Sequence, residues 1–203
     1  MNPNTPRLRF RLAAATIVAA SVLAACGSSD TDEASGTADA ATTATEAMTD
    51  EAMTDEAMAL PAWQTIALTD VDGATFTLDD FHGTPVFVET FATWCPKCKE
   101  QLGATNAAAE QLGDQAVFIA LSVETDLSSA DVAEYAADNG FDAVRFAVMT
   151  PEALAAFVDG LGQSAANPPS TPKVVIDPMG HAGELVTGFE SVDDIVAKVT
   201  GQG

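Results

Sequence analysis

Basic residues are scarce in this chain. Lys and Arg together number 8 among 203 residues, against 30 Asp and Glu, which gives a formal net charge of −22. Nucleic acid is bound largely through Lys and Arg that neutralise phosphates. The acidic balance therefore excludes nucleic acid as a partner, and it is typical of a highly soluble surface or a salty environment.

Ligands for a metal are also few, because the chain has only 3 Cys and 2 His. A structural zinc site needs four ligands from such side chains. His82 and His181 are the two histidines, and neither has ligand spacing to the cysteine pair at 95 and 98. We therefore expect no metal at the cysteines.

The most informative segment that is present is Trp94-Cys95-Pro96-Lys97-Cys98. It follows the apolar run 85–91 and precedes the helix-compatible run 99–102. Two cysteines at i and i+3 at a helix start can close a small disulfide, and helix N–H groups and the helix dipole there stabilise a thiolate. The spacing predicts thiol–disulfide exchange, with a metal site or a structural disulfide as the weaker alternatives.

The segment 91–100 resembles the active-site signature of membrane-anchored thioredoxin-like oxidoreductases, the TlpA, ResA and cytochrome-c-maturation relatives of thioredoxin. The resemblance spans residues 62–199 and includes a Thr-Pro pair before a late strand. It implies an α/β, thioredoxin-like fold, with a central mixed sheet flanked by helices and extra N-terminal strands. It also implies an enzyme whose redox-active disulfide needs no cofactor.

The first 25 residues predict a lipoprotein signal peptide. Arginines at 7, 9 and 11 precede the apolar run 12–23, which is shorter than the ~20 residues of a membrane span. Leu23-Ala24-Ala25-Cys26 matches a bacterial lipobox, and this resemblance implies that Cys26 carries the lipid that anchors the protein. The predicted location is the extracytoplasmic side of a bacterial cell envelope. The alternative is an ordinary signal peptide that has a cysteine nearby.

Residues 26–61 predict an acidic, disordered tether, because this stretch is rich in Ala, Thr, Asp and Glu and has no Lys or Arg. A repeated Glu-Ala-Met-Thr-Asp places methionines at 48, 53 and 58. A charged spacer is the simpler interpretation, and Cu(I) binding by thioethers is the other. From Cys26 onward five basic residues face 30 acidic ones, a net charge of −25.

Residues 62–203 predict one thioredoxin-like (redoxin) domain. About 140 residues are enough for one well-buried core. The expected strands cover 63–68, 75–78, 85–91, 117–123 and 144–148, with a late hairpin of 173–176 and 184–187. The expected helices cover 96–112, 128–139, 151–160 and 191–199. Strand–helix–strand followed by a hairpin and a helix is the thioredoxin order.

The resemblance assigns the two thiols. Cys95 is expected to be the exposed nucleophile that attacks a substrate disulfide, and Cys98 to be the buried thiol that resolves the mixed disulfide. Glu89 stands six residues before Cys95, on the same strand face as Phe87 and Phe91. This position predicts a buried carboxyl that takes the proton of Cys98, whereas the alternative is an exposed strand position.

Three further residues are expected to bind substrate. The resemblance implies that Pro172 is cis and packs against the cysteines, and that the Thr171 backbone pairs with an extended substrate segment. The prolines of Asn167-Pro168-Pro169 are rivals that stand farther from the strand. Trp94 is expected to form an apolar lip beside Cys95, or otherwise to pack in the core.

The predicted function is reduction of protein disulfides, with a role in cytochrome c maturation, by a monomer that exchanges electrons with a membrane partner. The alternatives are a dithiol oxidase for secreted proteins and a Sco-like copper chaperone, which needs Cys-x-x-x-Cys. A peroxiredoxin needs Pro-x-x-x-Thr-x-x-Cys, and no such run is present. We expect a reduction potential nearer the ~−270 mV of thioredoxin than the ~−120 mV of a strong oxidant. The reason is that buried Glu89 should disfavour the Cys95 thiolate more strongly than Lys97 favours it.

Overall fold

The computed structural model describes residues 60–201. The predicted signal peptide, the lipid site at Cys26 and the tether up to residue 59 lie outside the described residues. Among the residues that are described, no helix has the length and apolar character to span a bilayer.

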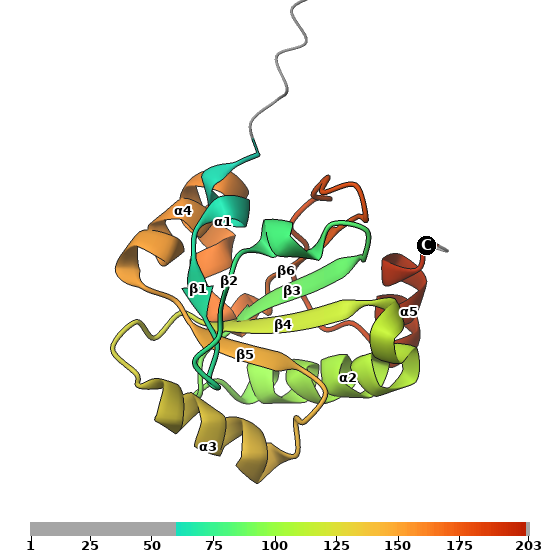
Figure 1. Cartoon of the computed structure of the whole chain (residues 1–203). Coiled ribbons are helices and arrows are strands. Elements are labelled where there is room, and N and C mark those ends of the chain that lie inside the picture. Colours follow the sequence, from blue (N-terminus) through green and yellow to red (C-terminus); the bar gives the residue numbers. More distant parts are fainter. Residues whose placement is uncertain (1–59, 202–203) are drawn as a thin grey trace, which may run out of the picture. The chain divides into compact units, whose positions relative to one another are not determined.

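A four-stranded mixed sheet forms the centre of the domain (Figure 1). Its strands are β3 (Val86–Phe91), β4 (Val117–Ser122), β5 (Arg145–Val148) and β6 (Lys173–Ile176), in the order β5-β4-β3-β6. β3, β4 and β5 run parallel, whereas β6 is antiparallel to β3. All six residues of β3 are buried, as a central strand covered on both faces requires. The sheet confirms the predicted fold class.

Helices cover both faces of this sheet (Figure 1). On one face lie α2 (Pro96–Leu112), α3 (Ser129–Asn139) and α5 (Val192–Val199), and on the other lie α1 (Ala62–Thr65) and α4 (Pro151–Leu161). Alternation along β3 sends Phe87 and Phe91 toward α2, and Val86 and Val88 toward α4. Short 3-10 turns complete the domain: η1 (Leu78–Phe81), η2 (Gly113–Gln115), η3 (Gln163–Ala166) and η4 (Pro168–Ser170).

Local capping signals predict several helix ends correctly. Ser128 accepts the N–H of Asp131 in a capping box at the start of α3, and Gly140 ends that helix in the left-handed conformation at φ 68°. Ser191 and Asp194 form the same box at the start of α5. α2 has the predicted bounds. These agreements follow because a cap satisfies backbone groups within a single turn.

The first predicted strand, 63–68, is wrong over most of its length. Residues 62–65 form α1, and only β1 (Leu68–Thr69) and β2 (Thr75–Phe76) make the N-terminal antiparallel pair. A contact with a residue far along the chain favours the helix, because Trp63 packs edge-on against Phe157 of α4 with ring centroids 5.4 Å apart. Gly160 makes the approach possible, since a Cβ there would lie 2.2 Å from the Trp63 ring.

The second arm of the predicted hairpin, 184–187, is not a regular strand. Only isolated bridges join residues 182–186 to β6, at Lys173–Val186 and Ile176–Ala182. These bridges span three steps on β6 but four on the opposite arm. The extra residue makes a bulge, which breaks the ladder that the sequence pattern predicts.

Candidate active site

The two cysteines lie where the chain leaves β3 and enters α2. Cys95 is the N-cap of α2, and its Sγ accepts the N–H of Cys98 at 3.2 Å. Cys95 and Cys98 form a disulfide with a Cα–Cα distance of 5.3 Å. Pro96 occupies the first helical position, where its fixed φ suits the helix and its missing N–H costs nothing. A redox-reactive pair is thus held at the positive end of a 17-residue helix.

Cys95 is not exposed in this oxidised structure, so the expectation of an exposed nucleophile is wrong here. Cys95 and Cys98 are each 2% exposed. The disulfide holds Cys95 Sγ against the first turn of α2, which removes it from the surface. Its neighbour Trp94 is instead 60% exposed, so core packing of Trp94 is also wrong. The role of Trp94 as a substrate lip stays a prediction.

A carboxylate holds the loop that leads to Cys95. Glu124, just after β4, accepts the N–H of Thr93 at 2.6 Å and the Thr93 hydroxyl at 2.8 Å. Thr93 stands two residues before Cys95. No pattern in the sequence indicates Glu124, because 31 residues separate it from Thr93 and no local motif connects the two. The contact fixes the loop and places negative charge near the first cysteine.

Pro168 lies closer to the cysteines than the sequence predicted. Its carbonyl oxygen is 3.2 Å from Cys98 Sγ, because η4 turns back against α2. In the reduced protein the Cys98 thiol can donate to this oxygen, which favours the protonated form over the thiolate. The sequence disfavours Pro168 as the proline beside the cysteines, because it stands farther from β6 along the chain than Pro172 does.

The backbone N–H and carbonyl of Thr171 both have partners within the protein. It is 5% exposed and is the one non-glycine residue with positive φ in the described range, at φ 48°. Its N–H donates to Pro168 O at 2.7 Å, and its carbonyl accepts from Lys173 Nζ at 2.8 Å. The N–H therefore already has a partner, whereas the carbonyl oxygen can accept a second hydrogen bond, and the predicted pairing with substrate stays a prediction.

Pro172 is buried, and its carbonyl accepts the N–H of Thr90 on β3 at 3.1 Å. This bond ties the start of β6 to the strand that carries Glu89. The predicted cis isomer and the substrate role of Pro172 stay predictions.

Glu89 is buried beneath the site, at 3% exposure. Burial raises the pKa of its carboxyl to about 8, while the Thr105 hydroxyl and Lys173 ammonium pull this pKa down and Glu190 pushes it up. Its Oε1 has no hydrogen-bond partner among the described residues. Burial confirms the predicted position and contradicts the exposed alternative. A carboxyl with this pKa can both accept and release a proton near neutral pH.

No hydrogen bond joins Glu89 to Cys98 among the described residues. Proton transfer from Cys98 to Glu89 therefore needs a movement of the side chains or a bridging water.

Lys173 is a buried cation that the sequence pattern predicts only as a strand residue. It is 1% exposed and pairs with Glu89 across β3 and β6. Its Nζ donates to the carbonyls of Thr171 and Gly188. Burial lowers the pKa of Lys173, and Glu190 and Glu89 oppose this. The sequence signal for this buried cation is a lysine within an otherwise apolar strand that lies opposite the predicted acid.

The segment before α5 is fixed to α2 by a buried amide. Gln101 is fully buried, accepts the N–H of Glu190 at 2.8 Å and donates to its carbonyl at 3.3 Å. The Glu190 side chain forms an ion pair with Lys198 of α5. Glu89, Lys173, Glu190 and Lys198 thus form a charge cluster that leads from the interior toward the surface.

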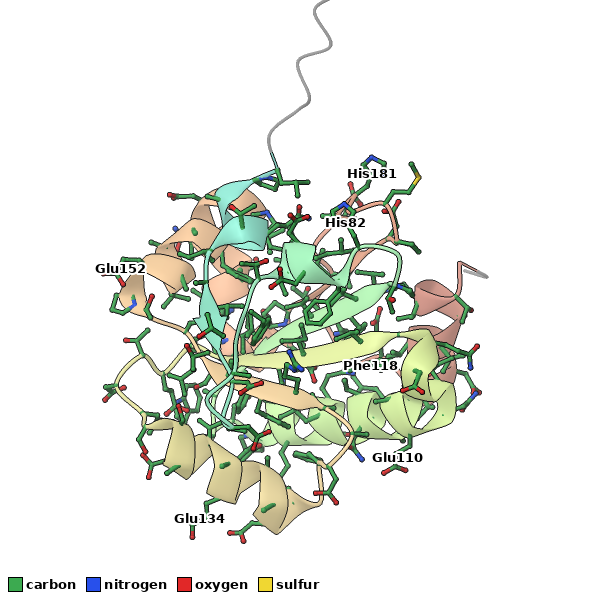
Figure 2. The ribbon with its side chains drawn as sticks, in the orientation of Figure 1. His82, Glu110, Phe118, Glu134, Glu152 and His181 are labelled. Atoms are coloured by element: carbon green, nitrogen blue, oxygen red, sulfur yellow. A yellow bond between two sulfur atoms is a disulfide. The ribbon has the colours of Figure 1, made fainter. Side chains whose placement is uncertain are left out.

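The histidines cannot complete a metal site with the cysteines. His82 precedes β3 and His181 follows β6, and these strand ends adjoin through the Val86–Ile176 pair. The cysteines follow the other end of β3, which spans about 20 Å. Figure 2 shows both histidines on neighbouring loops on one side of the sheet, with α2 below it. Residues 60–201 contain no cluster of three or more His, Cys, Asp or Glu suited to a metal ion.

A disulfide at the start of α2, above a buried acid, defines a thiol–disulfide oxidoreductase. The chain belongs to the AhpC/TSA family, whose model matches residues 60–162, about half of the sequence. The peroxiredoxin run Pro-x-x-x-Thr-x-x-Cys is absent from that segment. A comparison with curated proteins found no match.

Solved structures confirm the thioredoxin-like fold. A thiol:disulfide interchange protein of the thioredoxin family from Chlorobium tepidum has 22% identity and a TM-score of 0.58, over 68% of this chain and 92% of its own. An exposed lipoprotein thioredoxin, Etrx1, from Streptococcus pneumoniae has 23% identity and a TM-score of 0.56, over 67% and 98%. A secreted Mycobacterium tuberculosis disulfide oxidoreductase homologous to E. coli DsbE has 15% identity and a TM-score of 0.53, over 68% and 97%.

Proposed function

We propose that this protein is an extracytoplasmic reductase of protein disulfides, anchored to the bacterial envelope by a lipid on Cys26. Its redox-active disulfide is the only redox group the proposal needs. Electrons come from a membrane donor, and apocytochrome c is the proposed substrate, as the resemblance to cytochrome-c-maturation proteins implies. The acid-base group beneath the Cys95–Cys98 pair supports the chemistry, and the signals at residues 1–26 support the location.

The catalytic cycle starts with both cysteines reduced. The Cys95 thiolate attacks one sulfur of the substrate disulfide, forms a mixed disulfide and releases a substrate thiolate. Cys98 gives its proton to Glu89, and its thiolate attacks Cys95 Sγ. The Cys95–Cys98 bond forms as the mixed disulfide breaks, and the second substrate thiolate leaves. Two electrons have passed to the substrate, and the two thiolates take up protons from Glu89 and solvent.

The observation that carries the reductive direction is the position of Glu124. A strong oxidant needs a highly stabilised thiolate at its first cysteine. Lys97 and the start of α2 provide some of this stabilisation, but the half-buried Glu124 carboxylate, which is hydrogen-bonded to Thr93, opposes it. A half-buried charge acts through a lower effective dielectric than an exposed lysine. Glu89, which the sequence predicts to have this role, has a pKa of about 8 and is mostly neutral at pH 7.

The reduction potential tests the direction. Equilibration with glutathione buffers should give a value nearer ~−270 mV than ~−120 mV. Glu124→Gln keeps an acceptor for Thr93 but removes the charge, so it should make the potential less negative, whereas Glu110→Gln, at an exposed position on α2, should leave it unchanged. A wild-type value near ~−120 mV would make the protein a dithiol oxidase. Tight Cu(I) binding by the reduced protein would favour the Sco-like alternative.

The location is tested separately. Two of the similar structures are those of an exposed lipoprotein and a secreted oxidoreductase, which accords with the proposal. Cys26→Ser should release the protein from membranes, because a lipid-modified cysteine supplies the chains that stable attachment needs. Full membrane partition of this variant would contradict lipid anchoring.

A further inference from the structure

Glu89 needs a route by which its proton reaches solvent. Its pKa of about 8 leaves it mostly protonated at pH 7, so it must lose that proton before it can accept the one from Cys98. The Glu89 side chain is buried, and in the oxidised protein both cysteines are buried as well. Other groups must therefore carry the proton between this carboxyl and the surface.

Three buried oxygens in this region have no hydrogen-bond partner. They are Glu89 Oε1, Thr105 Oγ1 and Glu190 Oε2, half of the six such side-chain atoms in the described residues. The Thr105 hydroxyl lowers the pKa of Glu89, so it lies close to the carboxyl, although its oxygen makes no direct hydrogen bond. A buried water typically makes about three hydrogen bonds to polar groups that are otherwise unsatisfied. Three oxygens of this kind are suited to hold one water.

Two sets of hydrogen bonds bring Glu190 to the same region. Gln101 lies one turn before Thr105 on the same face of α2, and its side chain bonds to both backbone groups of Glu190, at 2.8 and 3.3 Å. Lys173, the cross-strand partner of the buried acid, donates to the carbonyl of Gly188, two residues before Glu190. The segment 188–190 is therefore fixed both to α2 and to the lysine beside the acid.

The Glu190 carboxylate connects the interior with the surface. Its Oε1 pairs with Lys198, and its Oε2 is buried. The side chain is 16% exposed and lines an open pocket of about 560 Å³ beside α5. Glu190 raises the pKa of both Glu89 and Lys173, as expected for a carboxylate close to each of them. One group thus faces the buried acid on one side and solvent on the other.

We propose that a water molecule binds between Glu89 Oε1, Thr105 Oγ1 and Glu190 Oε2, and that Glu190 passes protons between Glu89 and solvent. Glu89 gives its proton to the water as the water gives one of its own to Glu190 Oε2. Rotation of the Glu190 carboxyl then brings the protonated oxygen to the open pocket, where the proton leaves to solvent. The inference rests on the proposed function, because it supplies the base that Cys98 requires.

The charged and titratable groups around Glu89 include one that offers a different route. Lys173 faces it from β6, and Glu190 with Lys198 faces it from the α5 side. Tyr135 faces it from α3, because burial first, and then the Glu89 and Glu124 charges, raise the pKa of the Tyr135 hydroxyl. The Tyr135 hydroxyl also has no hydrogen-bond partner, so the experiment must distinguish it from Glu190.

Exchange of the Glu89 proton with solvent tests the route without any substrate. In the oxidised full chain with isotope-labelled glutamate, NMR line widths across the Glu89 titration give the exchange rate, and the midpoint gives the pKa. Glu190→Gln keeps the backbone bonds to Gln101 but cannot carry a proton, and Thr105→Val keeps the shape but removes the hydroxyl. Each should slow the exchange by about 10²-fold.

The two variants shift the pKa of Glu89 in opposite directions. Glu190→Gln should lower it and Thr105→Val should raise it, because the wild-type groups act the other way. Slower exchange in both is therefore not a consequence of the altered pKa. The controls are Glu184→Gln, which removes the same charge from an exposed position, and Tyr135→Phe. Both should keep the wild-type exchange rate.

A second measurement connects the route to the reaction. Stopped-flow measurement at pH 7 follows the step in which Cys98 resolves a glutathione mixed disulfide on Cys95. This step should slow in Glu190→Gln, although the lowered pKa of Glu89 alone would make it faster.

The outcomes separate the inference from the proposed function. If either test variant keeps the wild-type exchange rate, or if a control slows exchange equally, the route through Glu190 is wrong and the reductase function stands. If exchange slows in both test variants while resolution by Cys98 does not, Glu89 is not the base for Cys98, and that part of the proposed mechanism falls together with the inference.

Discussion

Glu89 and Lys173 lie opposite each other across the antiparallel strands β3 and β6, and both side chains are almost fully buried. Their opposite charges favour each other, but burial disfavours the charged form of both and moves their pKa values toward each other. The site therefore contains a carboxyl, Glu89, that can exchange a proton near neutral pH, and a cation, Lys173, that lowers the pKa of this carboxyl.

Glu89→Gln should remove a transition near pH 8 from the pH–rate profile. Glutamine has a similar size but cannot accept the Cys98 proton, so the step in which Cys98 resolves the mixed disulfide should slow by about 10²-fold or more. Stopped-flow measurement of that step from pH 6 to 10 checks this. An unchanged profile would remove Glu89 from the mechanism, and an unchanged melting temperature at pH 6 would show that the fold is intact.

The same residue should make stability depend on pH. The carboxyl has a pKa of 4.5 when unfolded and about 8 when folded, so between these values the folded state binds the extra proton. Stability should therefore fall as pH rises from about 5 to 8, by up to about 4 kcal/mol, and then level off. Urea unfolding across this range should show the slope in wild type and its loss in Glu89→Gln. Equal slopes would contradict the raised pKa.

Lys173→Met should shift the Glu89 transition to higher pH. The Lys173 ammonium lowers the pKa of Glu89, so its removal allows burial to raise that pKa further. Glu190→Gln should shift it the opposite way, because Glu190 raises the same pKa. NMR titration of the Glu89 carboxyl in both variants measures the direction in which its pKa shifts. A purely structural role for these residues would not produce shifts of opposite sign.

The cysteines should differ in reactivity although both are buried when oxidised. Cys95→Ser should abolish exchange, whereas Cys98→Ser should accumulate mixed disulfides through Cys95. In the reduced protein Cys95 should be alkylated first, since it is the N-cap of α2 and the Cys98 thiol faces the Pro168 carbonyl. Faster labelling of Cys98 would reverse the two roles.

Two glycines provide a matched test of the packing. Gly160→Ala should destabilise the domain by about 1–3 kcal/mol, because the new Cβ would lie 2.2 Å from the Trp63 ring. Gly103→Ala, within α2 and with no atom within 4 Å of the new Cβ, should stabilise by about 0.5–1 kcal/mol. Urea unfolding of both variants measures the difference. Equal effects would mean that Trp63 does not pack against α4 as described.

The sequence by itself determined the features that depend on neighbouring residues. The Cys-x-x-Cys pair at the start of α2 and the caps of α3 and α5 could be predicted because their hydrogen bonds close within one turn. The burial of Glu89 could be predicted because side chains alternate along a strand and Phe87 and Phe91 share its face.

Only the tertiary structure decided which distant groups surround the disulfide. The approach of Pro168 to Cys98, the bond from Glu124 to Thr93 and the position of Lys173 opposite Glu89 all join residues far apart in the chain. The occupied backbone of Thr171 has the same origin, because Lys173 reaches its carbonyl only from within the folded core. Sequence pattern specifies which face a side chain occupies, but the partner it meets there depends on how the strands and helices pack.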